Sequence, residues 1–288
     1  MERLNTIASW REIAQSVRDD GHRVGLVPTM GALHDGHLSL VRRARENGDV
    51  VVLTSFVNPR QFSDVEDLAR YPHSPDADAA VAVSAGVDIF VTPSLLEMWP
   101  DYPAPTLTTV SVEELGDHLE GEGRPGHFDG VTSVVAKLLM ITGPCRAYFG
   151  EKDFQQLVVV RRMVRDLAFD VEVVGCATRR GEDGLALSSR NARLSPEGLR
   201  TATALSRALH AGIESSGVAS GRRALMREVM ASSGVDVAYA DIVDEARLTP
   251  LADEDRVVGR ALVAGFVEGV RLIDNDEIDL SKKGVTCS

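Results

Sequence analysis

The sequence predicts an α/β protein with a doubly wound, Rossmann-like parallel sheet domain and a smaller α+β C-terminal domain. The chain has 288 residues, which is enough for one large or two modest domains. In its first half, short β-branched runs alternate with amphipathic stretches, as in strands joined by crossover helices. After about Asn191 this alternation stops. The change in pattern indicates a second domain of a different class.

The strands of the first domain are expected at residues 24–27, 50–57, 87–91, 146–149 and 170–174. The first two are near-continuous apolar runs, as expected of parallel strands that are buried on both faces. Helices are expected between them, at residues 37–46, 76–85, 131–141 and 154–167. Five strands with helices between them make a doubly wound sheet the economical topology.

The second half has a different order of elements. Residues 196–216 and 222–233 have helical patterns, and residues 236–243 and 256–273 look like strands with a hairpin-like connection. The glycine- and charge-rich stretch 179–184 fits a mobile loop at a domain junction. We therefore predict one domain over residues 1–184 and a lid-like domain over residues 185–288. Residues 280–288 are expected to fray.

Composition excludes several classes of protein. No apolar run approaches the roughly 20 residues that span a bilayer, so a membrane protein is excluded. The net charge of -12 gives no global reason to bind a nucleic-acid backbone. The N-terminus does not resemble a secretion signal, and we expect a cytoplasmic protein. Cys145, Cys176 and Cys287 form neither a disulfide framework nor a metal-binding pattern, and the first two are interpreted as buried packing thiols.

The most informative segment is residues 28–37, between the first strand and the first helix. In open parallel sheets, ligands bind beyond the carboxyl ends of strands, where a helix N-terminus favours an anion. Gly31 and Gly36 let the backbone approach a phosphate, and His34 and His37 add donors for a triphosphate. Either histidine alone would be interpreted as a solvated loop residue. The HxGH unit in this position favours a functional interpretation.

Two further clusters combine polar and charged residues. The first leads from a predicted strand into a helix, and the second follows the glycine-rich stretch. Residues 149–156 offer Lys152 for a phosphate, Asp153 for a hydroxyl or an amine, and Gln156 for a polar substrate. An exposed helix cap would have a similar sequence. Residues 187–191 combine hydroxyls, a guanidinium and backbone N–H groups that suit phosphate oxygens. A serine-rich turn between domains is the alternative there.

Two loops between these clusters are less specific. Asn58 and Gln61 end the second predicted strand and offer donors and acceptors to a small polar substrate. A proline turn closed by an Asx hydrogen bond explains the same residues. Arg124 and His127 precede a predicted helix and would suit an anion, or simply form a surface turn.

Taken in order, the segments resemble the pantothenate synthetase family, the pantoate–β-alanine ligases of the HxGH nucleotidyltransferase superfamily. The resemblance covers nearly the whole chain and rests on VPTMGALHDGH, FVNPRQF, EDLARYP, EGEGRPGHFDGV, YFGEKDFQQL, DGLALSSRN and ALVAGFVEGVRLIDN. HxGH alone is shared by many adenylyltransferases. FVNPxQF and FGEKDxQQL distinguish this ligase family from them.

The resemblance implies condensation of pantoate with β-alanine through a pantoyl adenylate, with release of AMP and pyrophosphate. It implies His37, His34 and Lys152 as catalytic residues, and Asn58, Gln61 and Gln156 as ligands of pantoate and β-alanine. The residues implied to bind ATP, supplied with Mg²⁺, are Met30, Gly31, His34, His37, Gly150, Glu151, Lys152, Asp153, Arg179, Leu187, Ser188, Ser189 and Arg190. The resemblance also implies a homodimer. The charge and composition argue against nucleic-acid and membrane partners, and no residue is assigned as a metal ligand. If the SSRN segment lies at a hinge, the second domain would close over the adenylate and exclude water.

Some residues depart from the family pattern. Arg60 stands at an apolar or Thr position and is expected to point to solvent, while Arg179 replaces an apolar residue whose backbone meets adenine. Asp76 and Asp78 would suit magnesium, but an acidic first helical turn needs no metal. Two other functions remain open: a nucleotidyltransferase that adenylates a phosphorylated small acceptor, and a nucleotide-binding regulator.

Overall fold

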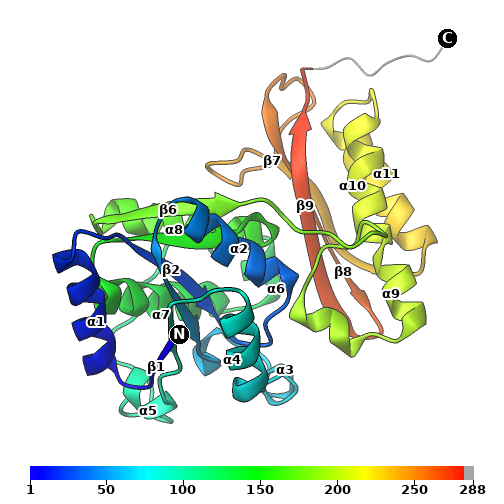
Figure 1. Ribbon diagram of the computed structural model, residues 1–288. Helices are drawn as coiled ribbons and strands as arrows, with labels where there is room; N and C mark the ends of the chain where they lie inside the picture. Colours follow the sequence, from blue (N-terminus) through cyan, green and yellow to red (C-terminus); the bar gives the residue numbers. More distant parts are fainter. Residues whose placement is uncertain (282–288) are drawn as a thin grey trace. The chain divides into compact units, whose positions relative to one another are not determined.

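The computed structural model describes residues 1–281 and divides the chain into two compact units (Figure 1). The first unit comprises residues 1–151 and 155–177, and the second comprises residues 152–154 and the chain from Thr178 onward. Residues 178–184, which we expected in the first domain, belong to the second unit. The fraying expected for residues 280–288 concerns mainly residues 282–288, which lie outside the described part.

A six-stranded parallel sheet forms the centre of the first unit. Its order is β1-β4-β3-β2-β5-β6. The strands are β1 (Glu2–Leu4), β2 (Val24–Thr29), β3 (Val50–Ser55), β4 (Ile89–Val91), β5 (Cys145–Gly150) and β6 (Val171–Cys176). The five expected strands are all present. The three-residue strand β1 at one edge is additional, because it is too short to show a pattern.

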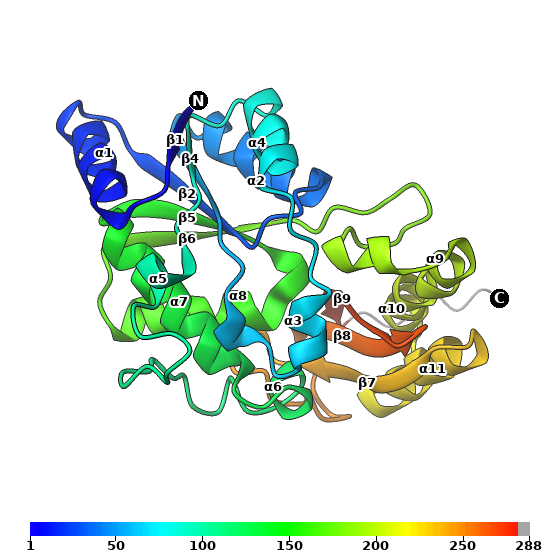
Figure 2. The same cartoon turned by 90° about the horizontal axis from the view of Figure 1, so that it is seen from below.

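Helices cover both faces of this sheet. Figure 2 shows α2 (Asp35–Glu46) and α4 (Pro75–Ser84) on one face, and α7 (His127–Thr142) and α8 (Phe154–Asp166) on the other. α1 (Ile7–Asp19) packs against α7. The remaining helical segments are α3 (Val65–Ala69), α5 (Leu95–Met98), α6 (Glu120–Gly123) and the 3₁₀ turns η1 (Pro59–Gln61) and η2 (Glu151–Asp153).

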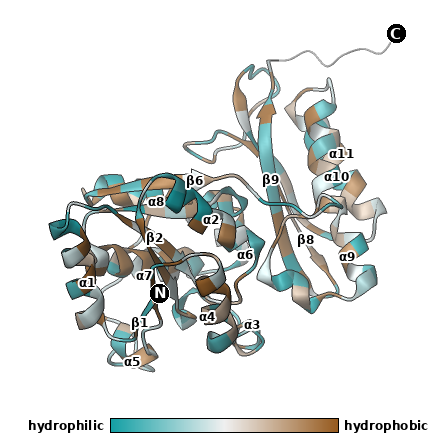
Figure 3. Cartoon of the chain, viewed as in Figure 1, coloured by the Kyte–Doolittle hydropathy of each residue, from teal (hydrophilic) through white to brown (hydrophobic). Residues whose placement is uncertain are grey.

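The hydrophobic pattern explains why these helices lie on the sheet. Leu40, Val41 and Ala44 of α2 recur at helical spacing and are buried against Val27 and Leu53 of the strands. The opposite side of α2 carries charged residues and is hydrophilic in Figure 3. Burial of this stripe fixes α2 against the sheet and therefore fixes the direction of its N-terminus.

The strand order places a topological switch point at β2. This strand pairs with β3 on one side and with β5 on the other, and the chain winds in opposite directions from it. The crevice at such a point is where open α/β sheets bind ligands. The HxGH segment follows β2 and the GEKD segment (Gly150–Asp153) follows β5, so both leave the sheet at this point.

The second unit is a three-stranded antiparallel sheet with helices packed on it. The sheet has the order β7-β8-β9. Its elements are η3 (Ser189–Arg193), α9 (Pro196–Ala202), α10 (Ala204–Glu214), α11 (Ala219–Ser232), β7 (Asp236–Val243), β8 (Val258–Val267) and β9 (Val270–Asp279). Leu205, Leu209, Met226, Ala261 and Val263 belong to the core between helices and sheet. The predicted α/β domain with a smaller α+β partner is confirmed.

Three details of the second half differ from expectation. The single strand expected over residues 256–273 is a hairpin that turns at Gly269, whose φ is +75°. The helix expected over residues 196–216 is interrupted at Thr203. The stretch 179–184 is part of a tight hairpin in which Leu187 N–H donates to the Arg179 carbonyl. The composition predicted an irregular loop here, and the structure has a hairpin instead.

Candidate active site

The two HxGH histidines form a reciprocal cap on α2. His34 is the N-cap, and its Nδ1 accepts from Gly36 N–H at 3.1 Å. His37 Nδ1 accepts from His34 N–H at 3.3 Å. Because a backbone N–H is always the donor, each Nδ1 acts as an acceptor, and the proton of each neutral imidazole is on Nε2. Both rings therefore present an Nε2–H donor, with their centroids 4.1 Å apart.

A buried carboxylate shapes the backbone before this cap. Asp78 of α4 is 3% exposed, and its two oxygens accept from Ala32 N–H at 3.0 Å and Leu33 N–H at 2.8 Å. Gly31 has a φ of +85°, and a Cβ there would lie 2.7 Å from Asp78 Oδ2 and from Ser55 Oγ. Glycine is thus required by both conformation and space. Asp78 therefore has a structural role in holding this loop.

The structure brings Asn58, Gln61 and Met30 together. Asn58 Nδ2 donates to Gln61 Oε1 at 3.1 Å, and Gln61 Nε2 contacts Met30 Sδ at 3.0 Å. Asn58 is 1% exposed and Gln61 is 9% exposed. Two residues predicted to bind the small substrates and one predicted to bind ATP are therefore neighbours beyond β2 and β3.

Arg124 and His127 hold the backbone of Gln61 in place. His127 Nδ1 donates to the Gln61 carbonyl at 2.7 Å, and Arg124 donates to the same oxygen at 3.3 Å. Arg124 also donates to His127 Nε2 at 3.1 Å, which is consistent with a proton on Nδ1. The sequence allows these two residues to be anion ligands or part of a surface turn. In the structure they fix the backbone at Gln61.

The structure separates the two glutamines of the GEKDFQQ segment. Gln155 is buried, and its amide bonds to Glu120 N–H, the Leu115 carbonyl and the His118 carbonyl. Gln155 thereby anchors the loop before α6 to α8. Gln156 is half-buried on the first turn of α8. A Cβ on nearby Gly150 would meet nothing within 4 Å, so packing does not require glycine at that position.

Lys152 and Asp153 belong to the second unit. Their side chains form an ion pair at 3.2 Å, and Lys152 is largely shielded from solvent. Asn275 of β9 donates to the Lys152 carbonyl at 2.8 Å, and the Arg260 guanidinium lies 4.1 Å from the centre of the Phe154 ring. The segment 152–154 is therefore positioned by β8 and β9.

The SSRN segment (Ser188–Asn191) follows the hairpin 179–187. Ser188 caps η3 by accepting from Arg190 N–H at 3.3 Å, and Asn191 Nδ2 donates to the Ala186 carbonyl. Arg180 anchors the hairpin through two bonds to buried Asp274, at 2.6 and 3.0 Å. Leu187, Ser189 and Arg190 are half-buried, whereas Arg179 is exposed.

The expectation that Arg60 points to solvent is wrong. Its guanidinium lies 4.8 Å from the centre of the Trp99 ring, and Nη2 donates to the Ala104 carbonyl at 3.4 Å. A guanidinium is planar and weakly hydrated, so it stacks readily on a large aromatic ring. The Arg60 side chain therefore packs on Trp99, close to Asn58 and Gln61.

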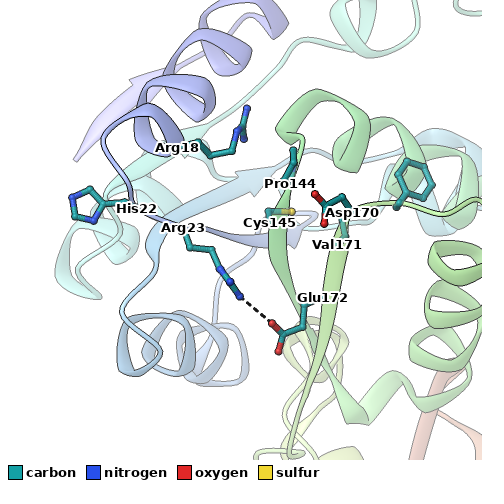
Figure 4. A pocket seen from close by; sticks show the side chains of 9 residues that line it. Arg18, His22, Arg23, Pro144, Cys145, Asp170, Val171 and Glu172 are labelled. Carbon is teal, nitrogen blue, oxygen red and sulfur yellow. Dashed lines mark hydrogen bonds and ion pairs between the residues drawn. The ribbon is translucent and has the colours of Figure 1, made fainter.

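A cavity of about 530 Å³ opens at the opposite end of the first sheet (Figure 4). It is lined by residues just before or at the start of β2, β5 and β6, among them Arg23, Cys145 and Glu172. Arg23 pairs with Glu172 at 3.2 Å, and Arg18 donates to the Thr142 carbonyl. These partners give the charged groups a structural role. Burial raises the pKa of Cys145 to about 12, so its thiol stays protonated near neutral pH.

Residues 1–281 contain neither a group of three or more His, Cys, Asp and Glu side chains arranged to hold a metal ion nor a helix that is long and apolar enough to cross a membrane.

Comparison with known proteins identifies the family. The sequence profile of the pantoate-beta-alanine ligases matches residues 2–277. The chain belongs to the pantoate–β-alanine ligase family. The pantothenate synthetase of Moorella thermoacetica is 47% identical over 288 residues, covering 98% of this chain and 100% of the relative. That of Cereibacter sphaeroides is 48% identical over 277 residues, covering 94% and 98%.

Solved structures show the same fold. The pantothenate synthetase of Thermus thermophilus aligns with a TM-score of 0.89 at 47% identity, covering 96% of this chain and 99% of the other. The pantoate-beta-alanine ligase of Francisella tularensis, solved with beta-gamma ATP and beta-alanine, aligns with a TM-score of 0.80 at 33% identity, covering 96% and 97%. The chain is therefore a ligase of this family. These findings favour the ligase over the nucleotidyltransferase that HxGH alone allowed.

Proposed function

We propose that this enzyme condenses pantoate with β-alanine in two steps. The pantoate carboxylate attacks the α-phosphorus of ATP, and pyrophosphate leaves. The β-alanine amine then attacks the acyl carbon of pantoyl adenylate, AMP leaves and the amine loses a proton. Because a free carboxylate does not react with an amine, adenylation supplies the leaving group. The protein contributes positioning and charge stabilisation.

The cap on α2 carries the proposal for the first step. We assign the ATP phosphates to the loop from Met30 to His37, with the Nε2–H groups of His34 and His37 donating to oxygens that gain charge as pyrophosphate leaves. The support is that both Nδ1 atoms accept from backbone N–H groups. Each ring is thereby held in the tautomer that donates from Nε2 without a conformational change.

Gln61, Gln156 and Asn58 are proposed to bind the small substrates. Gln61 would contact both pantoate and β-alanine, and Gln156 would contact pantoate. Asn58, whose amide already bonds to Gln61 and three other protein groups, would contribute to substrate binding by holding Gln61. The support for Gln61 is its low exposure and its contact with Met30 in the proposed ATP loop. Gln156 is supported by contrast with Gln155, whose amide bonds to three backbone groups.

The other proposed ATP contacts come from Gly150 and η2, and from the hairpin 179–187 with the SSRN segment that follows it. Gly150 and Glu151 would approach ATP together with Lys152 and Asp153. A further set comprises Arg179, Leu187, Ser188, Ser189 and Arg190. Lys152 would be catalytic as a compact cation on a phosphate oxygen. ATP would enter as its Mg²⁺ complex, since Mg²⁺ is usually held by substrate phosphates with one or two carboxylates.

Three broader properties are also proposed. We expect a homodimer, a cytoplasmic location, and a lid role for residues 185–288. Size measurement in solution tests the first, and fractionation of the cells that produce the protein tests the second. The lid predicts that solution scattering changes on addition of ATP and pantoate. Identical scattering profiles with and without these substrates would contradict the lid.

Pantoate-dependent exchange of labelled pyrophosphate into ATP tests the proposed function most directly. The exchange isolates the first step because β-alanine is omitted. Wild-type protein should exchange only when pantoate is present, and His37→Ala should lose about 100- to 1,000-fold in rate. Tight ATP binding without exchange would instead identify a regulator. Adenylation of a phosphorylated acceptor would identify the nucleotidyltransferase.

A further inference from the structure

The side chain of Asn58 uses its full hydrogen-bonding capacity. Its Oδ1 accepts from the Trp99 indole Nε1–H at 3.1 Å and from Arg60 N–H at 3.3 Å. Its Nδ2 donates to the Gly130 carbonyl at 3.0 Å and to Gln61 Oε1 at 3.1 Å. An amide group has two donors and an acceptor with two lone pairs, and all four are engaged here.

These partners allow only one orientation of the Asn58 amide. After a flip, Nδ2 would face two N–H donors, and Oδ1 would face the Gly130 carbonyl. Neither the indole nor a backbone N–H can become an acceptor. Because Asn58 is buried, no solvent would compensate for the lost bonds. The Trp99 indole, the Arg60 N–H and the Gly130 carbonyl together fix which end of the Asn58 amide reaches Gln61, and Trp99 is the side chain among them.

The orientation of Asn58 determines that of Gln61. Since Asn58 presents a donor, Gln61 must direct its Oε1 toward Asn58 and its Nε2 toward Met30. The group that faces the HxGH loop is thus an N–H donor. A carboxylate or hydroxyl oxygen is the partner that such a donor recognises. A reversed Gln61 would present a carbonyl oxygen and repel a carboxylate.

Trp99 itself is held by two cations. The Arg60 guanidinium lies 4.8 Å from the centre of its ring and the Lys137 ammonium lies 5.0 Å from it. Lys137 also donates to the Met98 carbonyl. Trp99 is buried at the end of α5, so the ring has a fixed position from which its N–H reaches Asn58.

We propose that Trp99 is a positioning residue of this ligase, which acts through Asn58 to keep the amide nitrogen of Gln61 directed at the carboxylate or hydroxyl of the acid substrate. The proposal rests on the proposed binding role of Gln61. It makes Trp99 a determinant of affinity for the acid and not for the nucleotide.

The test is a double-mutant cycle on the pantoate-dependent exchange of pyrophosphate. Trp99→Phe removes the indole donor and keeps an aromatic ring. It should raise KM for pantoate about tenfold, the effect of one lost buried hydrogen bond, and leave KM for ATP within about twofold. In a Gln61→Ala background the same change should have no further effect, because Trp99 acts through Gln61. An equal loss in both backgrounds, or an equal rise in both KM values, would overturn the proposal.

Trp10→Phe is the matched control. Trp10 is the other tryptophan of the chain and is fully buried, but its indole N–H has no hydrogen-bond partner among residues 1–281. It should leave KM for pantoate unchanged, and a rise equal to that of Trp99→Phe would contradict the relay. Asn58→Asp tests the next link, because it replaces the donor toward Gln61 with an acceptor. An unchanged KM for pantoate in that variant would also overturn the proposal. Absence of exchange in wild-type protein would instead refute the proposed function.

Discussion

His34 combines a structural and a chemical role in one ring. Its Nδ1 caps α2, and its Nε2–H is the group that we assign to phosphate. His34→Asn keeps an acceptor at the N-cap but removes the Nε2–H donor, whereas His34→Ala removes both. We expect the alanine variant to lose about 1 kcal/mol of unfolding free energy and the asparagine variant to lose little.

Both His34 variants should lose pyrophosphate exchange about 100-fold or more. Urea denaturation and exchange rates measured on the same preparations check these expectations. Wild-type exchange by His34→Asn would mean that the ring serves only as a cap.

Asp78 gives a second prediction at the level of a single residue. In Asp78→Asn, one carboxylate oxygen that accepts from a backbone N–H becomes a donor that opposes it. The variant should lose about 2 kcal/mol of stability and show a raised KM for ATP, because the loop at Gly31 is no longer held. Asp76→Asn is the control, because the Asp76 side chain is fully exposed and its ion pair with Arg3 is long, at 4.0 Å. Comparable losses in both variants would show that the helix dipole, and not the loop, explains the effect.

Close contact between η1 and α7 gives a prediction at the level of elements. A Cβ at Gly130 would lie 2.1 Å from the Arg60 carbonyl oxygen and 2.7 Å from Gln61 Cα. Gly130→Ala must therefore separate α7 from η1, at a cost of about 1–3 kcal/mol, and weaken pantoate binding through Asn58.

Gly221→Ala in α11 is the control, because its Cβ would meet nothing within 4 Å and alanine is the better helix former. Thermal denaturation and KM for pantoate distinguish the two. A neutral Gly130→Ala would show that the two elements can separate without cost.

Periodicity predicted the larger elements because their burial pattern is local. α2 and α8 have a continuous apolar stripe, and β2 and β3 are apolar along most of their length. β1 escaped prediction because three residues carry no period, and its pairing with β4 is a long-range choice. The turn at Gly269 was missed for a different reason, since apolar residues continue on both sides of it.

For the candidate site, the sequence predicted the motif residues but not the residues that hold them in place. The motif positions of His34, His37, Asn58 and Gln61 could be read along the chain, because the resemblance is itself linear. The partners of these residues could not. Trp99 and Asp78 lie far from Asn58 and Ala32 in sequence, and a tryptophan or a helical Asp gives no signal of the amide or loop that it will orient. Arg60 was misjudged because its stacking partner is 39 positions away.

Two buried thiols and one buried phenol make the stability of the molecule sensitive to alkaline pH. Burial raises the pKa of Cys145 to about 12 and that of Cys176 to about 11. Burial also raises the pKa of Tyr148 to about 12, assisted by its hydrogen bond to Asp49. In the unfolded chain a thiol ionises near pH 8.5, and a phenol ionises near pH 10. The thiols therefore respond between pH 8 and 10, and Tyr148 responds only above that range.

Stability should fall as the pH rises from 8 to 10. In this interval the unfolded thiols ionise while the folded thiols remain neutral, so the unfolded state releases protons that the folded state retains. Cys145 and Cys176 together should cost about 4 kcal/mol of unfolding free energy by pH 10. Urea titrations under reducing conditions should show this fall in wild-type protein and a clearly smaller fall in Cys145→Ala/Cys176→Ala. The comparison isolates the thiols because Lys137, whose pKa is lowered by burial, is present in both proteins. Parallel pH profiles would mean that both thiols ionise in the folded state, contrary to their burial.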